Sequence, residues 1–174
     1  MTPSTVLPPT LNALSKADFI ARLGGVFENS PWVAERAYPK RPFGGVRELH
    51  AAMCAEVAAA GEAAQLALIR AHPDLAGKAA LAGELTAASS SEQAGAGLDR
   101  LTEAEYGRFH DLNSRYRERF GFPFVLAVKG HDKTSILAAF EARLPNDADT
   151  ERATALQQVY EIARLRLGAL TEAP

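Results

Sequence analysis

The sequence predicts an all-α fold: a compact, single-domain bundle of about seven to nine helices with one extended connector. Three observations support this class. The chain is rich in alanine and has few β-branched runs, capping signals recur along it, and apolar residues repeat at helical spacing. Its 174 residues match the size of one ordinary domain. We therefore expect one helical domain over residues 1–174, in which residues 1–14 are a loosely ordered N-terminal segment.

The first half of the chain is expected to form four helices. Ser15-x-x-Asp18 is a capping signal ahead of apolar residues at helical spacing, and predicts a helix that extends to about Phe27. Ser30-Pro31 predicts the start of a short second helix, because proline is favoured at the first helical position. Two more helices are expected over Val46–Ala60 and Glu62–Ala71, with a break at Gly61.

Capping signals also define the helices of the second half. Ser89-x-x-Glu92 predicts a short helix that extends to Leu98, and Thr102-x-x-Glu105 predicts a helix over Glu103–Phe120 that Gly121 terminates. Two further helices are expected over Lys133–Leu144 and Ala148–Leu170.

Two segments interrupt the helical pattern. His72 precedes Pro73 and is therefore biased away from helical backbone angles, so it is expected at the boundary of an element. Residues 121–128 have the composition of a strand but no partner strand, and predict an extended, buried connector. The main-chain N–H and C=O groups of such a connector need hydrogen-bond partners, which a planar, amide-rich ligand could supply.

Charge and composition exclude several classes of protein. The chain has 19 Lys and Arg against 21 Asp and Glu and no long basic run, so we expect no nucleic-acid partner. We expect no membrane partner either, because no apolar run approaches the ~18 residues of a membrane span. The lone Cys54 fits a reducing compartment, and the C-terminus lacks a peroxisomal address. A cytoplasmic location is therefore expected.

No common metal, redox or nucleotide-binding motif is present. Of the four histidines, His72 is the strongest candidate for chemistry, since a boundary before a proline can hold an imidazole in place at a cleft. His50, His110 and His131 lie within predicted helices or beside flexible residues, where an exposed or core-edge role is more common.

Other polar residues have structural explanations. Asp74 is expected in the first turn of the following helix, where the helix dipole stabilises a negative side chain. Glu92 is the third-position acid of the Ser89 capping box. Arg164 and Arg166 are expected to cover apolar surface with their stems, although an arginine beside an apolar face can also bind a carboxylate.

Four separated motifs are similar to those of a known family. They are His72-Pro73-Asp74-Leu75-Ala76-Gly77-Lys78, Ser89-x-x-Glu92-Gln93, Leu112-Asn113-x-x-Tyr116 and Arg119-Phe120-Gly121-Phe122-Pro123-Phe124-Val125. In this order they resemble the OHCU decarboxylases, which act on 2-oxo-4-hydroxy-4-carboxy-5-ureidoimidazoline. The resemblance implies an all-α, cofactor-free and usually homodimeric enzyme that completes the conversion of urate to (S)-allantoin.

The resemblance also implies roles for individual residues. His72 matches the family's catalytic histidine, Glu92 its second catalytic residue, and Arg166 a functional C-terminal arginine. The implied substrate-binding positions are Pro73, Ser89, Gln93, and the main chain of Phe124, Val125, Leu126, Ala127 and Val128. No metal ligand is implied.

The chemistry suits these residue types. The ring C=N of the substrate can accept the electron pair that CO₂ leaves behind, so neither a cofactor nor a metal is expected. An imidazole such as that of His72 can then manage the proton. Glu92 could orient His72, hydrogen-bond the ureido group or repel the substrate carboxylate, and the sequence leaves these roles open.

Two other readings compete with a decarboxylase. A non-catalytic helical ligand-binding or interaction module would explain the helices and caps equally well. A metal-dependent hydrolase would use His72, Asp74 and a distant His50 or glutamate, but this ligand spacing is generic.

Overall fold

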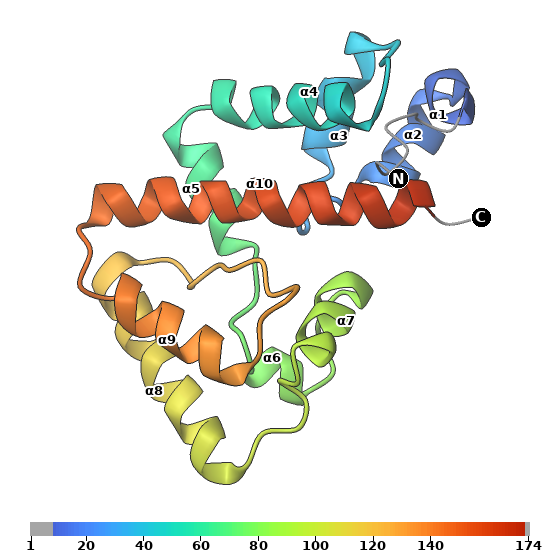
Figure 1. Cartoon of the computed structure of the whole chain (residues 1–174). Coiled ribbons are helices and arrows are strands. Elements are labelled where there is room, and N and C mark those ends of the chain that lie inside the picture. Colours follow the sequence, from blue (N-terminus) through green and yellow to red (C-terminus); the bar gives the residue numbers. More distant parts are fainter. Residues whose placement is uncertain (1–8, 173–174) are drawn as a thin grey trace. The chain divides into compact units, whose positions relative to one another are not determined.

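The computed structural model describes residues 9–172, and these residues form an all-α structure without strands (Figure 1). They fall into two compact units, one of residues up to 68 together with residues from 160 onward, and one of residues 69–159. We call these unit 1 and unit 2. Residues 1–8 of the predicted N-terminal segment lie outside the described residues, while residues 9–13 form a helix.

The helices have the following bounds: α1 Pro9–Ala13, α2 Lys16–Leu23, α3 Trp32–Ala37, a 3₁₀ helix Tyr38–Lys40, α4 Val46–Ala59, α5 Glu62–Arg70, α6 Lys78–Leu81, α7 Ala87–Gly95, α8 Glu103–Phe120, α9 Lys133–Arg143 and α10 Ala148–Glu172. The ten α-helices among the described residues exceed the predicted seven to nine because of the very short α1 and α6. Helices α5 and α10 each contribute residues to both units.

Unit 1 packs helix on helix. Helix α2 lies against α3, and α3 against α4 (Figure 1). The predicted cap is present at Ser15, whose hydroxyl accepts a hydrogen bond from the Asp18 N–H, but α2 ends at Leu23 rather than near Phe27. Helix α3 begins after Pro31, and the Ser30 hydroxyl donates to the Glu28 carbonyl instead of capping the helix. The apolar core of this unit includes Phe19, Leu23, Val33, Leu49, Met53 and Leu167.

Unit 2 is built around α8 and α9, which pack against each other. The predicted capping box at Thr102 and Glu105 is present, and Gly121 ends α8 in the left-handed conformation with a φ of 76°. A hydrogen bond from Lys133 and one from the backbone of Thr102 lower the pKa of Glu105 to about 2. Aromatic rings fill the core, and Phe124 stacks on Phe140 with 3.7 Å between centroids.

The predicted connector between α8 and α9 is confirmed. Residues 123–128 form neither helix nor strand, and Phe122, Phe124, Val125 and Val128 are buried. Figure 1 shows this segment as a long trace between the two helices. The unit therefore has a buried stretch of main chain without helical hydrogen bonds.

Among residues 9–172, no single helix is long and apolar enough to cross a membrane. Helices α4 and α5 meet the length and composition criteria only when taken together as a pair bent by 116°.

Candidate active site

The predicted boundary at His72 is confirmed. Helix α5 ends at Arg70, and the His72 N–H donates to the Ile69 carbonyl at 3.1 Å as the chain leaves the helix. The His72 side chain is buried, whereas Pro73 after it is half-buried. The non-helical residues 72–77, which we call the histidine loop, connect α5 to α6. His72 is thus a buried residue held just beyond the end of α5.

Gln93 of α7 holds the histidine loop with both ends of its side-chain amide. Its Oε1 accepts a hydrogen bond from the Ala76 N–H at 3.0 Å, and its Nε2 donates to the Asp74 carbonyl at 3.2 Å. Ala76 has a φ of 52°, an angle that residues with a Cβ adopt at a cost. The contacts of Gln93 contribute to holding this conformation.

Two side chains of helix α8 also hydrogen-bond the histidine loop. Asn113 Nδ2 donates to the Leu75 carbonyl at 2.8 Å, and the Tyr106 hydroxyl donates to the Gly77 carbonyl at 3.2 Å. Side chains of α7 and α8 therefore bond one main-chain group on each of the four successive residues 74–77. These bonds replace the helical ones that the loop lacks.

The Asn113 side chain is itself incompletely bonded. Asn113 is 5% exposed, and within residues 9–172 its Oδ1 is the one buried side-chain N or O atom without a hydrogen-bond partner. The bond from Nδ2 to the Leu75 carbonyl fixes the orientation of the amide.

The structural explanation predicted for Asp74 is wrong. Helix α6 starts only at Lys78, so Asp74 lies in the loop rather than in a first helical turn. Its Oδ1 instead accepts a hydrogen bond from Arg117 Nε at 2.8 Å, which is a third contact between α8 and the loop.

The predicted cap of α7 is also displaced. Thr86 is the N-cap, because its hydroxyl accepts from the Ser89 N–H at 3.2 Å, and the helix begins at Ala87. Ser89 therefore lies inside the helix, and Glu92 is not the acid of a capping box. Ser89, Glu92 and Gln93 are spaced three and four residues apart and share one helix face, on which Ser89 and Gln93 are buried and Glu92 is half-buried.

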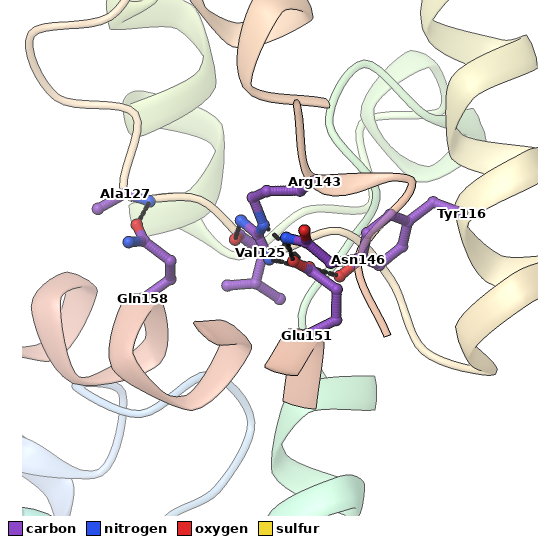
Figure 2. Close-up of polar contacts among 7 residues, drawn as sticks. All are labelled: Tyr116, Val125, Ala127, Arg143, Asn146, Glu151 and Gln158. Carbon is purple, nitrogen blue, oxygen red and sulfur yellow. Dashed lines mark hydrogen bonds and ion pairs between the residues drawn. The ribbon is translucent and has the colours of Figure 1, made fainter. Parts of the chain in front are cut away.

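Side chains of three helices, α5, α9 and α10, hydrogen-bond the connector. Arg70, two residues before His72, donates through Nε to the Gly121 carbonyl at 3.1 Å. Further along, the Val125 carbonyl accepts from Arg143 Nη1 at 2.7 Å, and the Ala127 N–H donates to Gln158 Oε1 at 2.9 Å (Figure 2). The main-chain groups of Val125 and Ala127 thus find partners in protein side chains.

The arginine that bonds the Val125 carbonyl also belongs to a buried ion pair. Arg143, at the end of α9, donates through Nε to Glu151 Oε2 at 2.9 Å, and Nη2 of Arg143 lies 2.9 Å from the same oxygen. Asn146 Nδ2 donates to Glu151 Oε1 at 2.9 Å, and the Tyr116 hydroxyl donates to Oε2 (Figure 2). Glu151 is 0% exposed, and both of its carboxylate oxygens are hydrogen-bonded within the protein.

Tyr116 remains protonated in this network. Burial, followed by the hydrogen bond to Glu151, raises the pKa of Tyr116 well above its ordinary value of 10. The guanidinium of Arg143 also lies 4.3 Å from the centre of the Phe124 ring, on the connector.

Arg166 belongs to unit 1, where it is buried. Its Nη2 donates to Glu28 Oε2 at 2.7 Å, and its Nη1 donates to the Gly25 carbonyl at 3.1 Å. Arg164 is exposed and pairs with Glu161 on the same helix. The two candidate arginines thus differ in environment, and only Arg166 is part of a buried ion pair.

The remaining histidines have the structural surroundings expected of them. His50 is half-buried in unit 1, with Nε2 2.8 Å from the Tyr160 carbonyl, while His110 is exposed and His131 contacts Ser135. Among residues 9–172, no group of three or more His, Cys, Asp or Glu side chains is placed to hold a metal ion.

Unit 2 therefore brings together most of the predicted site residues. Gln93 bonds α7 to the histidine loop, and Arg70, at the end of the helix before this loop, bonds the first residue of the connector. Sequence reasoning did not single out Arg143, Glu151 or Gln158. A signal existed for the two charged residues, because Arg143 is in helical register with the buried Ile136 and Phe140, and Glu151 with the buried Ala155 and Val159.

Comparison with known proteins identifies the class. A 2-oxo-4-hydroxy-4-carboxy-5-ureidoimidazoline decarboxylase of Haloferax volcanii is 48% identical over 157 residues, which are 90% of this chain and 91% of the relative. A uric acid degradation bifunctional protein of Bacillus sp. (strain TB-90) is 43% identical over 90% of this chain, which matches 30% of that longer protein. The crystal structure of (S)-allantoin synthase aligns with a TM-score of 0.76 and 33% identity, over 94% of this chain and 53% of that one.

The class is that of the all-α decarboxylases. The sequence profile of one family, OHCU decarboxylase, matches residues 12–168, and the chain belongs to this family.

The hold of α8 on the histidine loop can be tested at Asn113. In Asn113→Asp the donor to the Leu75 carbonyl is lost and a carboxylate oxygen takes its place, so the free energy of unfolding should fall by about 1–3 kcal/mol. Urea unfolding measures the change. Ser114→Asp, which adds the same charge at the exposed neighbouring position, should change it by less than about 0.5 kcal/mol. Equal losses in the two variants would contradict a specific role for Asn113.

Proposed function

We propose that this chain removes CO₂ from 2-oxo-4-hydroxy-4-carboxy-5-ureidoimidazoline to give (S)-allantoin, as a step of urate degradation. The observation that carries the proposal is the 48% identity to a decarboxylase of this name over about nine tenths of both chains. The buried histidine at the end of α5 supports it, because the reaction needs a proton delivered on one face of the substrate.

The chemistry balances without an external oxidant or reductant. The bond between the ring carbon and its carboxylate breaks, CO₂ leaves, and the electron pair moves into the adjacent ring C=N. A C=C bond thereby forms between the former carboxylate carbon and the ring carbon that carries the ureido group, and the ring nitrogen takes up a proton. The ureido-bearing carbon is then protonated while the hydroxyl on the former carboxylate carbon gives up its proton and becomes the ring C=O. Protonation from one side gives a single enantiomer. We propose that His72 handles this proton, either directly or through the substrate hydroxyl.

The neighbouring groups are proposed to bind and orient the substrate. Glu92 lies on the same face of α7 as the buried Ser89, and its carboxylate suits hydrogen bonding to ureido N–H groups or orientation of His72. Gln93 bonds the histidine loop and keeps a second amide hydrogen with which it can meet substrate. Pro73 and the main chain from Phe124 to Val128 complete the proposed pocket.

Arg166 is proposed as the functional arginine. Its guanidinium suits the binding and orientation of a substrate carboxylate, and the pairing with Glu28 would hold it in one orientation.

Three further properties are proposed with this activity. The enzyme works without a cofactor or metal, since the substrate ring supplies the electron sink. It forms a homodimer, which sedimentation equilibrium would distinguish from a single chain. It acts in the cytoplasm, as fractionation of the source cell would test.

The activity and the role of His72 can be tested together. The ureidoimidazoline is generated from urate by urate oxidase and hydroxyisourate hydrolase, and allantoin is followed by circular dichroism. The wild-type protein should produce (S)-allantoin rapidly, and His72→Asn should lower kcat by about 10²-fold or more, because general acid–base groups contribute factors of this size. His110→Asn changes an exposed histidine and serves as the control. Slow racemic product in every reaction would instead favour a non-catalytic helical binding module.

The carboxylate of Glu92 can be tested by Glu92→Gln, which keeps the size of the side chain and removes its charge. A role that needs the charge predicts a loss of about ten- to a hundredfold in kcat/KM. Steady-state rates give this value, with the exposed Glu84→Gln as the matched control. Turnover close to wild type in Glu92→Gln would limit Glu92 to hydrogen bonding.

The two arginines can be separated by parallel substitutions. Arg166→Lys keeps the charge but loses the planar fork, so kcat/KM should fall about tenfold or more, while the exposed Arg164→Lys should behave as wild type. Unfolding curves for both variants check that unit 1 is intact. If Arg164→Lys were the impaired variant, the assignment of Arg166 would be wrong.

A further inference from the structure

Two of the side-chain hydrogen bonds that hold the connector are made at Val125 and Ala127, with one residue between them. Between the helices α8 and α9 its main chain forms no ladder, and the bonds of Val125 to Arg143 and of Ala127 to Gln158 are made by side chains of α9 and α10. Leu126 lies between these anchors and is half-buried. Within the described part of the chain, neither the N–H nor the C=O of Leu126 forms a hydrogen bond.

We infer that Arg143, Glu151 and Gln158 are positioning residues, which hold the connector so that the unbonded main-chain groups of Leu126 meet the amide-rich substrate. This inference rests on the proposed function, in which the main chain of the connector lines the pocket. Beyond the proposed function, it assigns to these three side chains the role of holding that main chain in place.

The arrangement of Arg143 supports this role. A buried ion pair loses the hydration of both ions, and apolar residues of similar volume often give equal or greater stability. Stability alone therefore does not explain the pair. Glu151 fixes the guanidinium through Nε and Nη2, and this leaves Nη1 to donate to the Val125 carbonyl (Figure 2). The ion pair thus fixes the position of the Val125 carbonyl through Arg143. A lysine at this position could not bond Glu151 and the Val125 carbonyl in the same way.

Gln158 supplies the second anchor from a different helix. It is half-buried on α10, and Figure 2 shows its side chain directed at the Ala127 N–H. Because it takes no part in the ion pair, Gln158 can be changed without leaving a buried charge unpaired.

The test compares Gln158→Met, Gln158→Glu and Gln157→Met in the coupled allantoin assay. Gln158→Met keeps the side-chain length but removes the acceptor, so KM should rise about three- to tenfold while kcat changes less than twofold, since ground state and transition state lose the same contact. Gln158→Glu retains an acceptor oxygen and should restore a KM near that of wild type. Gln157→Met alters an exposed neighbour and should leave both constants unchanged. Arg143→Lys should raise KM in the same direction as Gln158→Met.

A second measurement does not depend on substrate. Amide hydrogen exchange at Ala127 should be faster in Gln158→Met than in wild type and slow again in Gln158→Glu. Unchanged exchange at Ala127, or a wild-type KM in a folded Gln158→Met protein, would overturn the inference. A wild-type enzyme that makes no (S)-allantoin would overturn the proposed function instead, and exchange at Ala127 would still decide whether Gln158 anchors the connector.

Discussion

Buried main-chain groups must be hydrogen-bonded, and in unit 2 two segments lack the helical bonds that would satisfy them. The histidine loop and the connector solve this problem in the same way. Side chains from neighbouring helices bond individual carbonyls and amides of these segments, with Gln93 and Asn113 on the loop and Arg143 and Gln158 on the connector. The shape of the candidate site is therefore set by long-range side-chain contacts on main chain that has no regular secondary structure.

This solution explains why polar and charged residues occupy interior positions of an otherwise apolar unit. A carboxylate as fully buried as that of Glu151 is tolerated because its oxygens are bonded by Arg143, Tyr116 and Asn146. Removal of one member would leave another without its partner, so these residues are expected to change together or not at all. Arg166 and Glu28 form a comparable pair within unit 1.

Local sequence signals predicted the local structure well. The helical periodicity, the capping box at Thr102, the left-handed Gly121 and the helix boundary at His72 each depend on residues close together in the chain. The predictions failed where two local solutions competed, as at α7, where Thr86 rather than Ser89 caps the helix. They also missed Gln158 and the ion pair of Arg143 and Glu151, because these contacts join residues far apart in sequence. The catalytic and binding roles came from the family resemblance and remain predictions.

The protonation of Tyr116 has a consequence for how pH profiles of this enzyme should be interpreted. A phenol whose pKa lies above its ordinary value keeps its proton throughout the neutral range, and its contribution to stability is lost only as pH rises above about 10. Its partner Arg143 is a guanidinium, which stays charged over the same range. A bend in the rate profile near neutrality would therefore report an ionisation other than those of Tyr116 and Arg143, and a histidine is the side chain whose ordinary pKa lies closest to that region.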